Sequence, residues 1–200
     1  MAGRRFPNAF LAVGALLAVT SCTDLDQASA AGVGPADAVA QIAGQLSDSA
    51  GLTYTATYRL AGGGTAKIVQ APSRTAYRWP GGSLIVTPTA TTRCGTTCVV
   101  SAPDAAEPAP ATGMITPGAV EAKLRVAAAD PALAITERDT TIAGRHAACV
   151  KLTGDFEACV TGDGTLAAFT GVLAGTELDM TLTDLTATVD EADFQPRPAR

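Results

Sequence analysis

Histidine is nearly absent from this sequence, and its scarcity narrows the chemistry that the protein can perform. His146 is the only histidine among 200 residues. A serine–histidine–acid triad would therefore have to use it, but no G-x-S-x-G turn is present to carry a nucleophile. His146 follows Gly144-Arg145 at the start of a predicted strand, where an exposed strand-edge position is the expected one. We therefore expect no enzymatic activity and no catalytic residues.

The sequence also lacks a surplus of positive charge and a long hydrophobic run. Its net charge is −5, so the basic patch of a nucleic-acid-binding protein is missing. A membrane-spanning helix needs about twenty consecutive apolar residues. The apolar run from Phe10 to Val19 has about half that length. These absences argue against a nucleic-acid partner and against a multi-span membrane protein.

Two glycine-rich motifs lack the residues that would make them ligand sites. Gly62-Gly63-Gly64 is not followed by the lysine and helix of a phosphate-binding loop. Thr161-Gly162-Asp163-Gly164-Thr165 lacks the repeated acidic ligands and closing glutamate of a calcium loop. Both are predicted to be turns, and we expect neither a metal nor a cofactor.

The first residues have the layout of a secretory signal peptide. Arg4 and Arg5 precede the short apolar run, and Val19-Thr20-Ser21-Cys22 resembles a bacterial lipobox. That resemblance implies a signal peptide at residues 1–21, cleavage before Cys22 and a diacylglyceryl group on the Cys22 thiol. The alternatives are an ordinary signal peptide with an incidental cysteine, and a twin-arginine export signal.

The lipobox also predicts where the chain is held and how. Two or three acyl chains on Cys22 would anchor the mature protein to the outer face of the cytoplasmic membrane, because each buried methylene contributes about 0.8 kcal/mol. Residues 22–35 are rich in small residues without periodicity, and they are predicted to be a flexible tether. Residues 36–196 are then expected to form a single domain.

Hydrophobic periodicity predicts two helices and a series of strands in this domain. Helical spacing runs from Pro35 to Gly51 and from Pro117 to Ala129, where Asp130-Pro131 ends it. Strict alternation begins at Leu52, and the pattern indicates antiparallel meanders before and after the second helix. A change of parity in the last strand predicts a bulge near Thr183 or Asp184. The strands are expected at about 52–60, up to 68, 76–80, 83–87, 133–142, 145–152, 156–161, 165–173 and 176–189.

Apart from Cys22, four cysteines remain, and an exported chain can pair them as disulfides. If Cys149 faces Cys159, Lys151 lies opposite Glu157 and the connecting loop has an allowed hairpin length. This register supports a Cys149–Cys159 disulfide. Cys94 and Cys98 are predicted to staple a tight turn between strands, the alternative being a redox-active or metal-binding pair.

The predicted strands share one hydrophobic face, and two helices are few to cover it. Such a sheet can close on itself or curl around helices, and incomplete filling would leave a cavity for an apolar ligand. A fully packed core is the alternative. The residues predicted to line the cavity are Tyr54, Tyr58, Ile68, Trp79, Leu84, Val86, Val120, Leu124, Met180 and Leu182.

The order of these elements resembles that of the LolA-like lipoproteins of actinobacteria, of the LprG and LppX type. The landmarks are AAADP at 127–131, IAGR at 142–145, the Cys149–Cys159 hairpin, Gly162-Asp163-Gly164 and the C-terminal DFQPRP. The resemblance implies an α+β fold: a curved antiparallel half-barrel with two or three helices on its concave side.

In that family the concave side holds acyl chains. The resemblance thus implies a membrane-anchored, extracytoplasmic lipoprotein that binds or carries a lipid or other hydrophobic ligand without catalysis. The alternative is an envelope sensor or scaffold lipoprotein that binds another protein.

Overall fold

The computed structural model describes residues 34–103, 108–130 and 132–199, which belong to one unit, Val33–Arg200. The predicted signal peptide, Cys22 and the tether up to residue 33 lie outside the described residues. Among the described residues, no helix is both long and apolar enough to cross a membrane.

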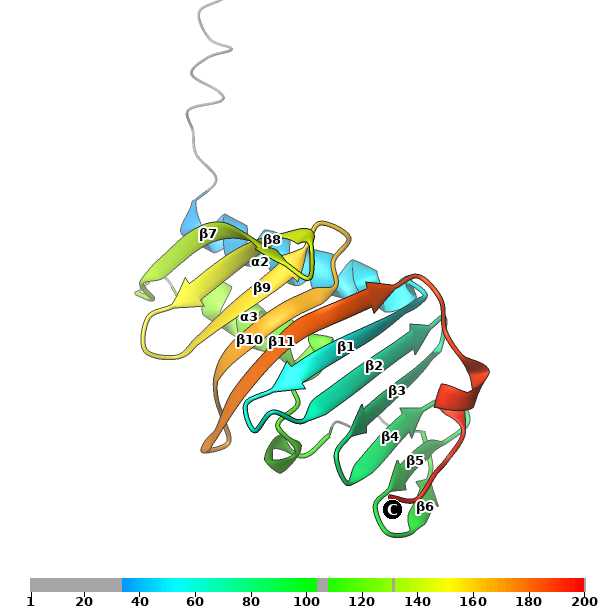
Figure 1. Ribbon diagram of the computed structural model, residues 1–200. Helices are drawn as coiled ribbons and strands as arrows, with labels where there is room; N and C mark the ends of the chain where they lie inside the picture. The colour runs from blue at the N-terminus through cyan, green and yellow to red at the C-terminus, as the bar shows by residue number, and fades with distance from the viewer. Residues whose placement is uncertain (1–33, 104–107, 131, 200) are drawn as a thin grey trace, which may run out of the picture. The chain divides into compact units, whose positions relative to one another are not determined.

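Eleven antiparallel strands form one sheet in the order β6-β5-β4-β3-β2-β1-β11-β10-β9-β8-β7 (Figure 1). Within each meander, strands that follow one another in the chain pair with one another. The pairing of β1 with β11 joins the two meanders into one sheet. The N-terminal meander consists of β1 (Tyr54–Leu60), β2 (Thr65–Ala71), β3 (Arg74–Trp79), β4 (Gly82–Val86), β5 (Thr91–Cys94) and β6 (Cys98–Ser101). The C-terminal meander consists of β7 (Ile135–Ile142), β8 (Arg145–Leu152), β9 (Phe156–Thr161), β10 (Leu166–Leu173) and β11 (Thr176–Thr186).

The expected half-barrel with helices in its hollow is wrong. The sheet is open, with β6 and β7 as its two edges, and it dominates the fold. The described residues contain two α-helices, α2 (Pro35–Asp48) and α3 (Pro117–Ala128). The two helices pack on each other. The main contacts of α2 with the sheet are to β7, β8 and β9. Two meanders joined edge to edge make a sheet that is too long for two helices to cover. The helices therefore cover one end of it. The remaining helical segments are the 3₁₀ turns η1 (Ser49–Gly51), η2 (Pro110–Thr112) and η3 (Glu191–Phe194).

Both helices form for the local reasons that their sequences indicate. Proline occupies the first turn of each, where its missing N–H costs nothing. The Thr116 side chain caps α3 by accepting a hydrogen bond from the amide of Ala119 at 3.1 Å. The apolar stripes of both helices are buried, as predicted; they comprise Val39, Ile42, Ala43 and Leu46 in α2, and Val120, Leu124 and Ala127 in α3.

The bulge in the last strand is confirmed. Thr57 of β1 pairs with Asp184, and the next residue of β1 pairs with Leu182. Thr183 is therefore an extra residue in β11, and it brings Leu182 and Leu185 onto the same face of the sheet.

Both predicted disulfides are present. Cys149 pairs with Cys159 in the β8–β9 hairpin, in the predicted register, with Lys151 opposite Glu157. Cys94 is bonded to Cys98 across the turn between β5 and β6.

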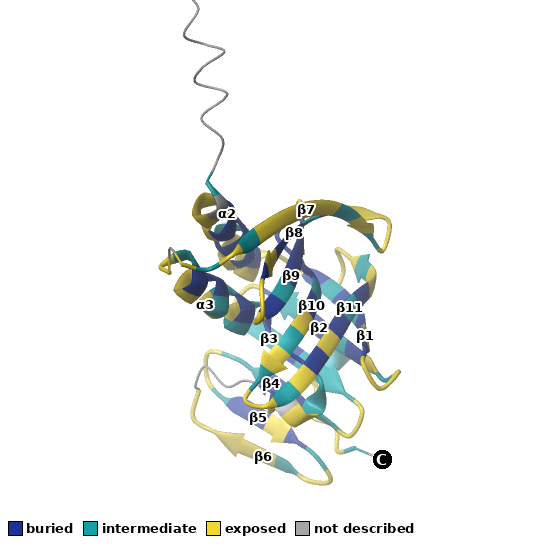
Figure 2. Cartoon of the chain, turned by 90° about the vertical axis from the view of Figure 1, so that its left-hand side faces the viewer, coloured by how far each residue is buried: buried dark blue, intermediate teal, exposed yellow. Residues whose placement is uncertain are grey.

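The core lies on the face of the sheet that the helices cover. Figure 2 marks buried positions in dark blue on both helices and along the strands. Successive residues of a strand point to opposite faces, so Ile68 joins this core while Val69 belongs to a smaller cluster on the other face. The C-terminal segment, residues 190–199, returns across β3 and covers that smaller cluster with Phe194. Arg78 holds the segment by donating to the carbonyls of Asp193 and Gln195, at 2.6 and 3.0 Å.

Candidate ligand-binding groove

An apolar groove of about 530 Å³ lies at one end of the N-terminal meander. Its walls come from the turn after β1, the turn after β3 and the segment that carries η2. We call it the Trp79 groove. It is lined by Leu60, Ala61, Gly62, Gly64, Trp79, Pro80, Ala111, Thr112 and Gly113.

Two glycines let the backbone approach closely enough to form this groove. Gly113 has a φ of 77°, a left-handed conformation that favours glycine, and a Cβ there would lie 3.4 Å from the Cδ1 of Leu60. A Cβ on Gly82 would lie 2.9 Å from the Trp79 ring. The indole is therefore fixed between the Gly82 backbone and the core, against which it is half-buried.

The lining determines what the groove can bind. No charged side chain lines it, and Thr112 carries the only side-chain hydroxyl among the lining residues. Its volume falls in the usual range for small-molecule pockets, about 300–1,000 Å³. Apolar burial supplies about 25 cal/mol per Å², so an alkyl or aromatic group is the ligand chemistry that fits.

A smaller pocket of about 260 Å³ lies near the start of β1 and contains charge. Arg145 and Asp163 approach to 3.4 Å in it, and the Thr161 hydroxyl donates to Asp163. Burial acts to raise the pKa of Asp163, but hydrogen bonds from Thr161 and Thr165 and the charge of Arg145 outweigh it and lower that pKa. Burial and the nearby Asp163 raise the pKa of Tyr54. These groups satisfy one another, which indicates a structural role for the predicted Gly162-Asp163-Gly164 turn.

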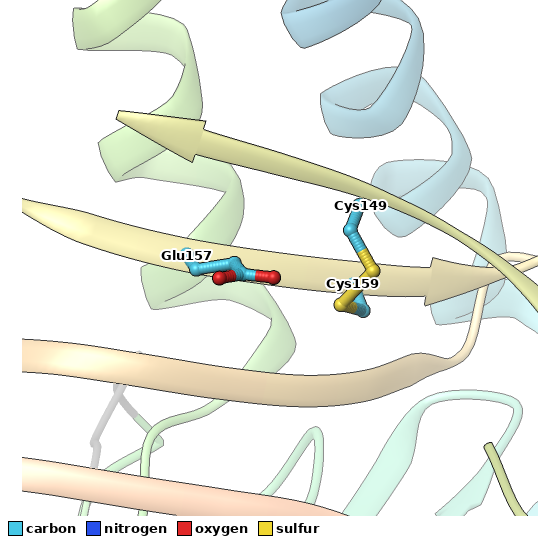
Figure 3. Close-up of side chains that lie close together, drawn as sticks. All are labelled: Cys149, Glu157 and Cys159. Atoms are coloured by element: carbon cyan, nitrogen blue, oxygen red, sulfur yellow. A yellow bond between two sulfur atoms is a disulfide. The ribbon is translucent and has the colours of Figure 1, made fainter. Parts of the chain in front are cut away.

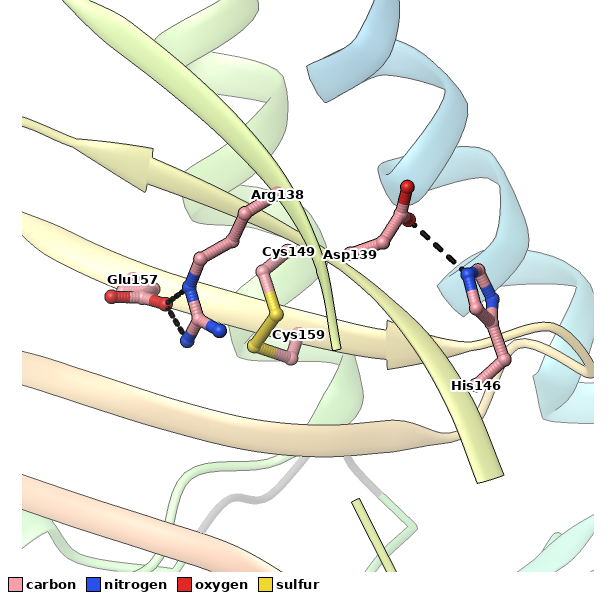
Figure 4. The surroundings of a disulfide bond; sticks show 6 residues. All are labelled: Arg138, Asp139, His146, Cys149, Glu157 and Cys159. Atoms are coloured by element: carbon pink, nitrogen blue, oxygen red, sulfur yellow. Dashed lines mark hydrogen bonds and ion pairs between the residues drawn. A yellow bond between two sulfur atoms is a disulfide. The ribbon is translucent and has the colours of Figure 1, made fainter. Parts of the chain in front are cut away.

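The Cys149–Cys159 disulfide forms part of the one group of potential metal ligands found among the described residues. Glu157 lies beside the two sulfurs, and the three ligand atoms are within 4.8 Å of one another (Figure 3). The sulfurs are bonded to each other, so neither is a thiolate. Arg138 donates to Glu157 at 2.8 Å and lies next to the disulfide (Figure 4). While the disulfide is intact, this group has no free thiolate to offer a metal.

His146 lies near this disulfide on β8 and is exposed, as the sequence predicts. Its Nε2 lies 3.3 Å from a carboxylate oxygen of Asp139 on the neighbouring strand (Figure 4). Both side chains are about 70% solvent-accessible or more. His146 belongs to a polar strand surface, whereas Asp139 also lines a pocket of about 180 Å³ that α2, β7 and β8 form.

Most of the predicted cavity-lining residues are packed in the core. Trp79 lines the groove, and Tyr54 lines the smaller charged pocket. Val86 is half-buried. The other seven are buried and line neither the groove nor the charged pocket; they are Tyr58, Ile68, Leu84, Val120, Leu124, Met180 and Leu182.

Sequence reasoning missed two residues that help to fill this core. Met114 and Ile115 precede α3 in an irregular segment, and each is only 1% exposed. A signal for one of them was present. Ile115 immediately precedes the helix cap Thr116, and Val120 occupies the fourth helical position, the spacing of a hydrophobic staple.

No protein-family model matches the sequence, and no curated protein matches it. Among solved structures, an uncharacterized conserved protein from Thermus thermophilus is similar over 80% of this chain and 96% of its own. The two share 12% sequence identity with a TM-score of 0.49. A likeness at this level carries no functional conclusion.

Proposed function

We propose that this chain is an exported lipoprotein that binds the apolar part of a lipid or other hydrophobic ligand in the Trp79 groove, without chemical change to the ligand. Cys22 anchors it to the outer face of the cytoplasmic membrane. The observation that carries the proposal is the 530 Å³ groove with no charged side chain in its lining. The lipobox-like Val19-Thr20-Ser21-Cys22 and the LolA-like order of elements support it from the sequence.

Trp79 provides a direct test because it is the only tryptophan in the chain. The full chain carrying Cys22→Ser, which cannot be acylated at that residue, is titrated with palmitate. A saturable blue shift of the tryptophan emission is expected, since an alkyl chain would displace water from the indole.

A matched pair of variants separates the groove from the rest of the surface. Ala111→Gln places a polar side chain in the groove wall and is expected to weaken palmitate binding by about tenfold or more. Val126→Gln changes an exposed residue of α3 that does not line the groove, and it should leave binding unchanged. Absence of any saturable shift in the parent chain would end the proposal.

The anchor has its own test. Cys22→Ala should release the protein from membranes into the soluble extracytoplasmic fraction, because the thiol that carries the lipid is gone. A variant that remains membrane-bound although residues 1–21 have been removed would show that Cys22 is not the anchor.

A second candidate function, an envelope scaffold that binds another protein, is favoured by edge strand β6. Val99 and Val100 on this strand are 64% and 66% exposed, and the edge of a sheet can accept a further strand. A photo-crosslinker at Val100 should then trap a defined envelope protein, whereas one at Thr140 on the opposite edge should not. Equal crosslinking at both positions would argue against this function.

A further inference from the structure

The segment from Ala111 to Ile115 faces the groove with one half and the core with the other. Its first three residues form a wall of the Trp79 groove. Its last two, Met114 and Ile115, are 1% exposed within the main core. Gly113, in its left-handed conformation, is the junction between the two halves. Met114 therefore follows directly on the groove wall along the chain, and it belongs to the same core cluster as Leu60, which lines the groove.

This segment is held by side-chain burial and by local hydrogen bonds. The amide of Thr112 donates to the carbonyl of Ala109 at 2.9 Å, and the amide of Met114 donates to the hydroxyl of Thr112 at 3.3 Å. The acceptors of both amides are thus local, in contrast to the strand amides, which pair across the sheet. An apolar group that replaced the Met114 side chain would leave these two bonds intact.

We infer that Met114 fills the inner end of the ligand site and that an unbranched alkyl chain can take its place. This inference rests on the proposed function. The methionine side chain is itself unbranched and flexible, with a shape close to that of a short alkyl chain. A ligand chain entering past Trp79 would then continue into the core next to Leu60, whose Cδ1 would contact a Cβ on Gly113.

If Met114 fills the inner end of the site, the length of acyl chain that the site can bury depends on this residue. Each additional buried methylene tightens Kd by about fourfold, and the gain stops where the site ends. Straight-chain fatty acids from hexanoate to stearate are titrated against the full chain carrying Cys22→Ser, with Trp79 emission as the signal. In the parent chain, an acyl chain that reaches Met114 has to displace the Met114 side chain, so its next methylenes should each add less than this gain of about fourfold. In Met114→Ala the side chain beyond Cβ is absent, so the full gain should continue for about three further methylenes.

Leu152→Ala is the matched control. Leu152 is as deeply buried as Met114, but it lies on β8, four strands from β1 in the sheet order, and does not line the groove. It should lower the unfolding temperature comparably and leave the chain-length limit unchanged. An identical limit in the parent chain, Met114→Ala and Leu152→Ala would overturn the inference while leaving the surface groove intact as a binding site.

Two failures can be told apart. Binding with the same chain-length dependence in all three chains overturns the inference alone, whereas no binding of any fatty acid by any of the three chains would refute the proposed function as well.

Discussion

The two meanders of the sheet are covered in different ways, and the difference indicates where a ligand could bind. The C-terminal meander is covered by regular structure: α2 contacts β7, β8 and β9, and Lys123 of α3 lies over the ring of Phe156. The N-terminal meander is covered by an irregular segment on one face and by the C-terminal segment on the other. The two helices cover the C-terminal meander, whereas the N-terminal meander ends at the Trp79 groove. A ligand is therefore expected to bind where an irregular segment, rather than a helix, covers the sheet.

The largest expected effect is a loss of stability, and it tests whether the C-terminal meander is packed more tightly than the N-terminal one. Phe169 on β10 is fully buried, and its ring stacks on Phe156 with centroids 5.5 Å apart. Phe169→Ala should lower the free energy of unfolding by about 3–5 kcal/mol. Val86→Ala on the half-buried side of β4 should cost about 1 kcal/mol. Urea denaturation measures both, and a loss from Val86→Ala as large as that from Phe169→Ala would contradict looser packing of the N-terminal meander.

The disulfides offer a second comparison, since each meander contains one. Replacing Cys149 and Cys159 by serine should cost about 3 kcal/mol, because their loop has a sequence separation of 10. Replacing Cys94 and Cys98, with a separation of 4, should cost about 2 kcal/mol. Thermal unfolding of the two double variants checks the order. A larger loss from the shorter loop would show that loop closure does not govern these bonds.

The third comparison concerns two turn glycines with similar backbone conformations. Gly164 has a φ of 85°, and a Cβ there would clash with the carbonyl oxygen of Gln45 in α2. Gly63 has a φ of 77° with open space around it. Gly164→Ala should cost about 2 kcal/mol or more, because it combines backbone strain with displacement of the helix, whereas Gly63→Ala should cost about 1 kcal/mol. Similar values in urea denaturation would exclude a role for Gly164 in docking α2.

The smallest effect is a pH dependence. The lowered pKa of Asp163 means that its carboxylate is favoured in the folded state, so its contribution is present at neutral pH and is lost as pH falls below about 4. Asp163→Asn should therefore flatten the loss of stability between neutral and acidic pH. The pKa of Glu191 is lowered by its hydrogen bond with Arg74, but this pair lies at the surface, so Glu191→Gln should change the profile less, especially at high salt. Urea midpoints measured across this pH range test the order of the two variants.

Local patterns in the sequence predicted local structure well. The alternation from Leu52 onward predicted the paired strands, and the opposition of Lys151 and Glu157 predicted the register of the disulfide hairpin. The change of parity in the last strand predicted a bulge near Thr183 or Asp184, and the structure has it at Thr183. Each of these features is determined by residues close together in the chain, or by which residues of one strand point to each face of the sheet.

The global form was predicted wrongly for a physical reason. Alternation shows which side of a strand is buried, but it does not show which strands from separate meanders pair. The β1–β11 pairing makes the sheet open and long, whereas a half-barrel was expected. In the same way, the apolar faces of Tyr58, Ile68 and Met180 indicated burial without showing what would cover them. Met114 and Ile115 helped to fill that space from an irregular segment.

The pairing of the first strand with the last also affects the order of events during synthesis. Thr55 donates its hydroxyl to the carbonyl of Thr188, a residue 133 positions further along the chain. A chain emerging from its N-terminus cannot complete β1 until almost all of it has been made, and such distant contacts slow folding. Until β11 has been made, one edge of β1 therefore stays open, while its other edge can already pair with β2.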